Sequence, residues 1–80
     1  MAASEAAVVT GASSGIGEAV AKALLERGLL VITLQRSAPK IAHPNLHFRQ
    51  VDLSDLSAAK AAAHEVAAEF PVRYLVNNAG

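Results

Sequence analysis

The pattern of hydrophobic and polar positions predicts four strands along this chain of 80 residues. Two runs, Ala6–Thr10 and Leu29–Leu34, are almost wholly apolar, which is typical of parallel strands covered on both faces. The run Leu46–Val51 alternates in part between apolar and polar residues, so we expect it at the edge of a sheet. The last run, Arg73–Val76, is short and ends in a polar turn.

Two helices are expected between these strands. The first runs from Gly15 or Ile16 to Arg27, and Gly28 stands where a left-handed C-terminal cap belongs. The second follows a turn at residues 52–55, with Ser54 as the N-cap, and ends at Pro71. The apolar faces predicted from helical spacing are Ile16, Val20, Ala23 and Leu24 in the first helix and Leu56, Ala59, Ala63, Val66, Ala67 and Phe70 in the second.

The connection between the second and third strands is predicted to be a loop. Pro39 and Pro44 both lie within residues 38–45, and proline disfavours a stable helix there. Without a helix, one face of the sheet is expected to be thinly covered near its edge.

Composition narrows the class of protein. Seven basic and seven acidic residues give zero formal net charge, which favours neither nucleic acid nor an anionic membrane as a partner. The chain has no cysteine, no signal-like N-terminus and no apolar run near the ~20 residues that span a bilayer. These features predict a cytoplasmic protein. The three histidines lack the acids or cysteines that would complete a metal site, so no metal is expected.

The glycine-rich stretch after the first strand is the strongest candidate for chemistry. Its order of strand, glycine-rich turn and helix is the context of a dinucleotide-binding turn. Gly11 lets the chain leave the strand sharply, Gly15 lets backbone N–H groups approach a pyrophosphate, and Gly17 lets the helix pack close to the sheet. The first turn of the helix then offers unpaired N–H groups to the phosphates.

The spacing of this stretch resembles a known family motif. Thr-Gly-Ala-Ser-Ser-Gly-Ile-Gly at residues 10–17, followed by Asn-Asn-Ala-Gly at residues 77–80, resembles the short-chain dehydrogenase/reductase family. The resemblance covers the whole chain. It implies an α/β fold, a Rossmann-like doubly wound parallel sheet with strand order 3-2-1-4. Residues 1–80 are then the N-terminal part of a single NAD(P)-binding domain, and the chain looks truncated after the second motif.

The end of the second strand bears on cofactor choice. NAD-binding folds place an acid there for the adenosine ribose, whereas this chain has Gln35 followed by Arg36. A guanidinium attracts a 2′-phosphate, and in the family an arginine here implies NADP(H), with NAD(H) less favoured. The alternative is a solvated arginine. Asp52-Leu53 resembles the family's pair beside the adenine ring, although Asp52 could equally cap the second helix.

The resemblance also assigns the last turn of the chain. It implies that Asn77 is mainly structural, that Asn78 lies near the cofactor, and that Gly80 allows close approach on the nicotinamide side. The predicted cofactor-binding residues are therefore Gly11, Ser13, Ser14, Gly15, Ile16, Gly17, Arg36, Asp52, Leu53, Asn78, Ala79 and Gly80.

No catalytic residue is predicted within these 80 residues. In the family a serine and a Tyr-x-x-x-Lys element, supported by an asparagine, act later in the chain, and Tyr74 does not match because Asn78 stands where the lysine belongs. The resemblance implies that the complete protein is an NADP-dependent oxidoreductase of small carbonyl or alcohol substrates and a homo-oligomer. The alternatives are a non-catalytic, self-standing nucleotide-binding half-domain or an NADP(H) sensor.

Overall fold

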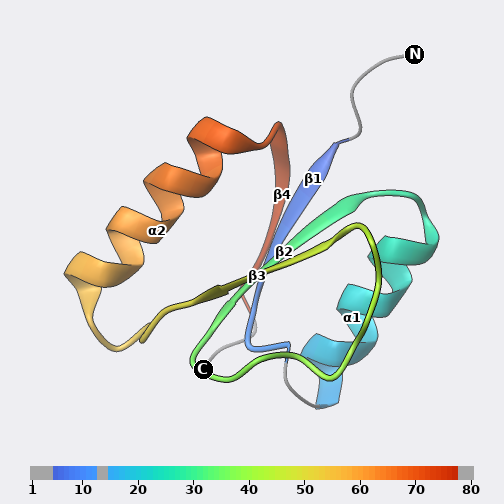
Figure 1. Cartoon of the computed structure of the whole chain (residues 1–80), viewed down its shortest axis with the longest axis horizontal. Coiled ribbons are helices and arrows are strands. Elements are labelled where there is room, and N and C mark those ends of the chain that lie inside the picture. The colour runs from blue at the N-terminus through green and yellow to red at the C-terminus, as the bar shows by residue number, and fades with distance from the viewer. Residues whose placement is uncertain (1–4, 13–14, 78–80) are drawn as a thin grey trace.

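The described residues form a parallel sheet of four strands with one helix on each face (Figure 1). The computed structural model describes residues 5–12 and 15–77. In chain order the elements are β1 (Ala6–Thr10), α1 (Gly15–Glu26), β2 (Leu30–Gln35), β3 (Leu46–Gln50), α2 (Leu56–Glu69) and β4 (Val72–Asn77). The strand order is β3-β2-β1-β4 and every pairing is parallel, which confirms the predicted α/β Rossmann-like order 3-2-1-4.

The two central strands form the core, as their apolar sequences predict. All five residues of β1 are buried, and so are all residues of β2 after Leu30. The outer strands β3 and β4 are largely half-buried or exposed, and β3 lies at the sheet edge as expected. Strand β4 is longer than predicted, β2 is shifted by one residue at both ends, and β3 ends one residue earlier than predicted.

Helix α1 packs on the sheet through small residues. Its buried positions are Gly17, Ala21 and Leu25, one turn apart from each other. The predicted face was therefore partly wrong: Ile16 is 75% exposed and Ala23 is exposed, while Val20 and Leu24 flank the buried line. Glycine and alanine bring the helix backbone close to β1 and β2, and this close approach turns the larger side chains outward.

A glycine cap ends α1 where the sequence places it. Gly28 has a φ of +86°, and its N–H donates to the Leu25 carbonyl at 3.0 Å. The Leu29 N–H donates to the Leu24 carbonyl at 3.2 Å, which completes a Schellman motif. The prediction of a left-handed cap at Gly28 is confirmed.

Helix α2 covers the opposite face of the sheet, and its start corrects the prediction. The N-cap is Asp55, whose carboxylate accepts the Ala58 N–H at 3.1 Å, and not Ser54. Ser54 is instead bonded to Asp52, which removes it from the helix. Val66, Phe70 and Ala59 lie on the covered side as predicted, but Leu56, Ala63 and Ala67 are exposed, and Ala58 and Ala62 pack against the core in their place.

The connection between β2 and β3 contains no helix, as the two prolines predict. Ile41 from this loop packs against the core cluster that also contains Ala21 and Leu25 of α1. The face is thinly covered there, and Phe48 of β3 remains 36% exposed. At the other edge Leu75 is 69% exposed, whereas Val76 packs against the same cluster.

Candidate cofactor-binding site

The carboxyl ends of the strands meet the glycine-rich turn. In this sheet β1 and β4 are neighbours, yet the chain leaves β1 toward β2 and returns from β3 to β4. Ligands of doubly wound sheets bind outside the strand ends at such a switch point. Gly11 follows β1 directly with a φ of +71°, a conformation that glycine adopts without strain.

Gly15 opens α1 and faces free space. Its φ is +64°, and a Cβ added there would meet no atom within 4 Å. The glycine is therefore required by its backbone conformation, while the space beside it is open to a ligand. Ile16 is exposed at the same helix end and Gly17 is buried against the sheet. The predicted residues Ser13 and Ser14 lie outside the described residues.

Thr10 and Asn77 connect the carboxyl ends of β1 and β4. The Thr10 hydroxyl donates to Asn77 Oδ1 at 3.1 Å. The two residues are also register partners in the parallel pair. This contact agrees with a structural role for Asn77. Asn78, Ala79 and Gly80 lie outside the described residues.

Gln35 closes the end of β2 with a buried carboxamide. Its Oε1 accepts the Ala12 N–H at 2.6 Å, and its Nε2 donates to the Ser37 carbonyl at 2.7 Å. The side chain is only 5% exposed. The sequence marks Gln35 as the residue at the position of the ribose acid, but not as a partner of the turn. The bond joins residues 23 positions apart, so the sequence around Gln35 carries no local signal for it.

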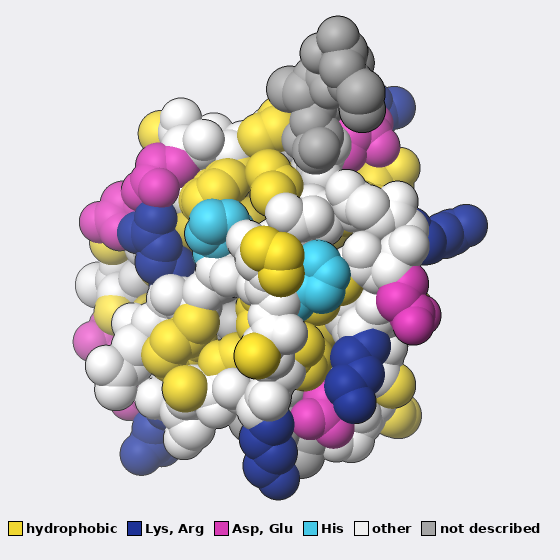
Figure 2. Space-filling model, turned by 45° about the vertical axis from the view of Figure 1, so that its right-hand side comes forward, with side chains coloured by type: hydrophobic (Ala, Val, Ile, Leu, Met, Phe, Trp, Pro, Cys, Tyr) yellow, Lys and Arg dark blue, Asp and Glu magenta, His cyan; other side chains and the backbone are white. Residues whose placement is uncertain are grey.

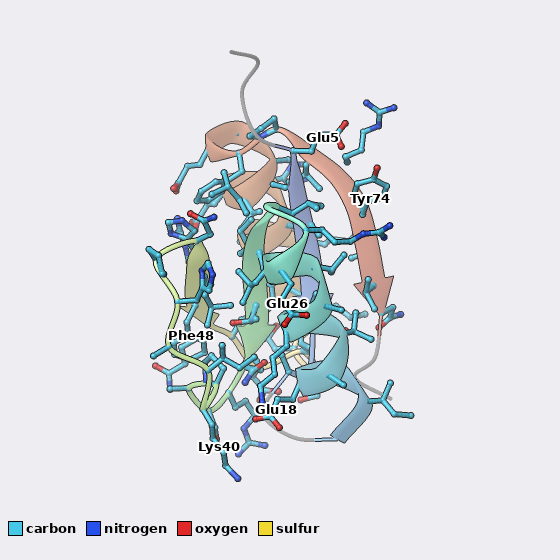
Figure 3. The ribbon with its side chains drawn as sticks, turned by 90° about the vertical axis from the view of Figure 1, so that its right-hand side faces the viewer. Glu5, Glu18, Glu26, Lys40, Phe48 and Tyr74 are labelled. Atoms are coloured by element: carbon cyan, nitrogen blue, oxygen red, sulfur yellow. The ribbon has the colours of Figure 1, made fainter. Side chains whose placement is uncertain are left out.

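Arg36 is exposed immediately after Gln35, at the same end of the sheet. Figure 3 shows Lys40 at this end too, extending away from the strands, while Glu5 and Tyr74 lie at the opposite end. Figure 2 shows basic side chains projecting from the lower end of the molecule, which is the same carboxyl end, with an acidic side chain among them. Figure 3 places Glu18 at this end as well, so the basic residues here lie near a carboxylate.

Asp52 is an ionised carboxylate near Arg36. Its Oδ1 accepts the Ser54 hydroxyl at 2.6 Å and the Ser54 N–H at 3.0 Å. The hydroxyl bond first, then the N–H bond, and to a smaller extent the charge of Arg36 hold the pKa of the Asp52 carboxyl below its ordinary value of 3.8. Since Asp55 caps α2, the alternative that Asp52 caps this helix is not realised.

A pocket of about 190 Å³ lies between these elements. Gly11, Gln35, Arg36, Val51 and Leu53 line it, so it joins the end of β1 to the ends of β2 and β3. Three of these residues, Gly11, Arg36 and Leu53, are predicted cofactor residues that lie far apart in the sequence. Val51 was not predicted, and it supplies an apolar wall.

A larger hollow of about 440 Å³ lies elsewhere, between α1 and β4. Leu24, Arg27, Leu29, Tyr74 and Val76 line it, and the wall is mostly apolar. It lies at the end of α1 and the start of β2, away from the glycine-rich turn. The smaller pocket is therefore the candidate cofactor site despite its size.

Neither helix of the described residues is long and apolar enough to cross a membrane. Within the same residues no group of three or more His, Cys, Asp or Glu side chains could hold a metal ion.

A glycine-rich turn at the switch point of a parallel sheet defines a nucleotide-binding α/β protein. The family model described as short chain dehydrogenase matches residues 5–80, and the chain therefore belongs to this family. It is 42% identical over 79 residues to the uncharacterized oxidoreductase DltE of Bacillus subtilis, covering 91% of this chain and 31% of that protein. It is also 42% identical over 78 residues to D-erythrulose reductase of Gallus gallus, covering 91% and 30%.

A solved structure has the same fold. The ligand-free aldohexose dehydrogenase of Thermoplasma acidophilum superposes with a TM-score of 0.87 at 33% identity, covering 96% of this chain and 30% of that one. The chain thus spans about a third of the length of the curated relatives it matches. It corresponds to the nucleotide-binding region of an oxidoreductase family that uses nicotinamide cofactors.

Proposed function

We propose that this chain holds the adenosine and pyrophosphate part of NADP(H) in a short-chain oxidoreductase. The observation that carries the proposal is the end of β2, where no carboxylate is available for a ribose and an exposed guanidinium follows a buried amide. A carboxylate at that place would repel a 2′-phosphate, and a guanidinium attracts it. NAD(H) is the less favoured cofactor on the same ground.

Each predicted residue has a role in this proposal. The backbone from Gly11 to Gly17 would surround the pyrophosphate at the start of α1, where unpaired N–H groups favour an anion. Arg36 would contact the 2′-phosphate, with the charge of Lys40 nearby. Asp52 would accept a hydrogen bond from the adenine amino group and Leu53 would lie against the ring. Asn78, Ala79 and Gly80 would line the side toward the nicotinamide.

The nicotinamide cofactor would donate a hydride to a small carbonyl compound or, in the reverse direction, accept one from the corresponding alcohol. D-erythrulose reductase and aldohexose dehydrogenase, two of the proteins similar to this chain, are named for such compounds. The residues of this chain would bind and orient the cofactor, and the residues that contact the substrate would lie outside it. Residues 1–80 would then be the first part of one Rossmann domain in a cytoplasmic homo-oligomer.

The test is the affinity for the two reduced cofactors, measured by nucleotide fluorescence with the natural protein that contains this chain. We expect NADPH to bind at least about 10-fold more tightly than NADH, because a charge-assisted contact contributes about 1.5–3 kcal/mol. Arg36→Asp should weaken NADPH by about 30-fold and remove the preference.

The matched control is Arg73→Asp. Arg73 is an exposed arginine at the start of β4, paired with Glu5 at the opposite end of the sheet. The substitution changes the net charge by the same amount and should leave the NADPH to NADH ratio unaltered. If Arg36→Asp keeps the wild-type preference for NADPH, the proposal is wrong.

A further inference from the structure

The carboxamide of Gln35 is buried where β2 meets the glycine-rich turn. Both of its polar atoms are occupied: Oε1 by the Ala12 N–H at 2.6 Å and Nε2 by the Ser37 carbonyl at 2.7 Å. One side chain therefore links the loop after β1 to the loop after β2. The bond to Ala12 joins residues 23 positions apart in the sequence.

The backbone of the turn depends on this side chain. Ala12 has no exposed surface, so water does not reach it to replace a lost partner of its N–H group. A buried N–H without an acceptor costs about 1–3 kcal/mol. Without the Gln35 oxygen, the Gly11–Ala12 segment would have to rotate until its N–H found another acceptor. The turn is therefore held in its shape by a residue of the neighbouring strand.

The next residue, Arg36, follows the end of β2 and is exposed. Gln35 and Arg36 both line the pocket of about 190 Å³. The buried amide and the exposed guanidinium are therefore consecutive residues at the border of the proposed adenosine site.

We propose that Gln35 is a positioning residue for the cofactor. It fixes the amide of Ala12 and with it the turn that receives the pyrophosphate, while it takes no part in the contact with the ribose. The inference rests on the proposed cofactor function. A turn that is ordered before binding loses less conformational freedom when the ligand arrives, so the gain appears as affinity for the pyrophosphate.

Two ligand fragments separate this role from general stability. ADP-ribose carries the pyrophosphate without a 2′-phosphate, and 2′-AMP carries the 2′-phosphate without a pyrophosphate. Gln35→Met, which keeps the length of the side chain but forms neither hydrogen bond, should weaken ADP-ribose about 10-fold and 2′-AMP less than about 2-fold.

Gln50→Met is the matched control. Gln50 is the register partner of Gln35 on β3, but it is exposed, and its Nε2 donates to the Arg36 carbonyl at 3.3 Å. The variant should change the affinity for either fragment less than about 2-fold. Equal losses of both fragments in Gln35→Met would indicate general destabilisation and would overturn the inference.

Hydrogen exchange of the Ala12 amide gives a second, ligand-free readout. The amide should be protected in the wild type and in Gln50→Met, and should exchange at least about 10-fold faster in Gln35→Met. Equal protection of the Ala12 amide in the wild type and Gln35→Met would overturn the inference, whatever the affinities for the two fragments are. A wild-type protein that binds neither fragment would instead refute the proposed function, and the positioning role would fall with it.

Discussion

The two ends of the sheet carry similar residues to different effect. Each end has a glycine with positive φ beside open space, Gly15 at the carboxyl end and Gly28 at the amino end. Each end also has an arginine near a carboxylate, Arg36 near Asp52 at the carboxyl end and Arg73 near Glu5 at the amino end. At the amino end Arg73 pairs directly with Glu5 at 3.0 Å, so the two charges satisfy each other. At the carboxyl end the polar side chains bond mostly to backbone or to Ser54.

This difference explains why one end is suited to a ligand. Gln35 and Asp52 fix loops, and the exposed Arg36 has a carboxylate only as a neighbour that it influences electrostatically. The amino end instead has an apolar hollow and a closed surface ion pair. Position relative to the strand direction separates the two ends, because only the carboxyl end presents the start of α1.

The largest difference between the two ends is expected when a methyl group is added at Gly15 or at Gly28. Gly15→Ala and Gly28→Ala should each cost about 1–2 kcal/mol of folding stability, because alanine is strained at positive φ. Only Gly15→Ala places its Cβ in the proposed pyrophosphate space, and it should weaken NADPH by at least about 30-fold. Thermal unfolding and nucleotide titration of both variants measure the two effects.

Gly28→Ala is the control in this pair, since its added atom also meets nothing within 4 Å. Its NADPH affinity should stay within about 2-fold of the wild type wherever the protein is folded. Equal loss of affinity in the two variants would mean that strain alone, and not the location of the glycine, determines binding.

A smaller effect is expected in the pH dependence of folding stability below neutral pH. The pKa of Asp52 is lowered in the folded state, so its contribution is fully present above the unfolded value of 3.8 and is lost as the pH falls through the folded pKa. Asp52→Asn should therefore reduce the proton uptake on acid unfolding by up to about one proton. Urea titrations between about pH 2 and 6 test this, and an unchanged pH slope would contradict the bonding described for Asp52.

The smallest effect is expected from a substitution at the amino end of the sheet. Glu5→Gln removes the charge that Arg73 and the Tyr74 hydroxyl contact. Because exposed ion pairs contribute little, the stability should change by less than about 0.5 kcal/mol and NADPH binding not at all. A loss of NADPH affinity in this variant would show that the two ends are coupled.

The sequence predicted the strands and helices well because they rest on strong local signals. Unbroken apolar runs identify β1 and β2, and two prolines exclude a helix between β2 and β3. The strand order followed from the family resemblance and is confirmed. Gly28 was identified because a glycine after a helical pattern has few other structural uses.

Finer features depended on contacts that the sequence does not display. Ser54 and Asp55 are both good caps, and Asp52 decides between them by bonding to Ser54. The buried side of α1 includes Gly17, as the sequence predicted, but continues through Ala21 and Leu25, which the helical pattern did not single out. The bond from Ala12 to Gln35 joins two strands' ends, so no local pattern announces it.

The central claim is that the carboxyl end of this sheet binds NADP(H). The most direct measurement is the change of backbone amide chemical shifts when NADP⁺ is added to isotope-labelled protein. We predict large shifts at Gly11, Ala12, Gly15–Gly17, Arg36 and Leu53, and none at Gly28 or Arg73. Shifts concentrated at Gly28 and Arg73, or no shifts at saturating NADP⁺, would contradict the account.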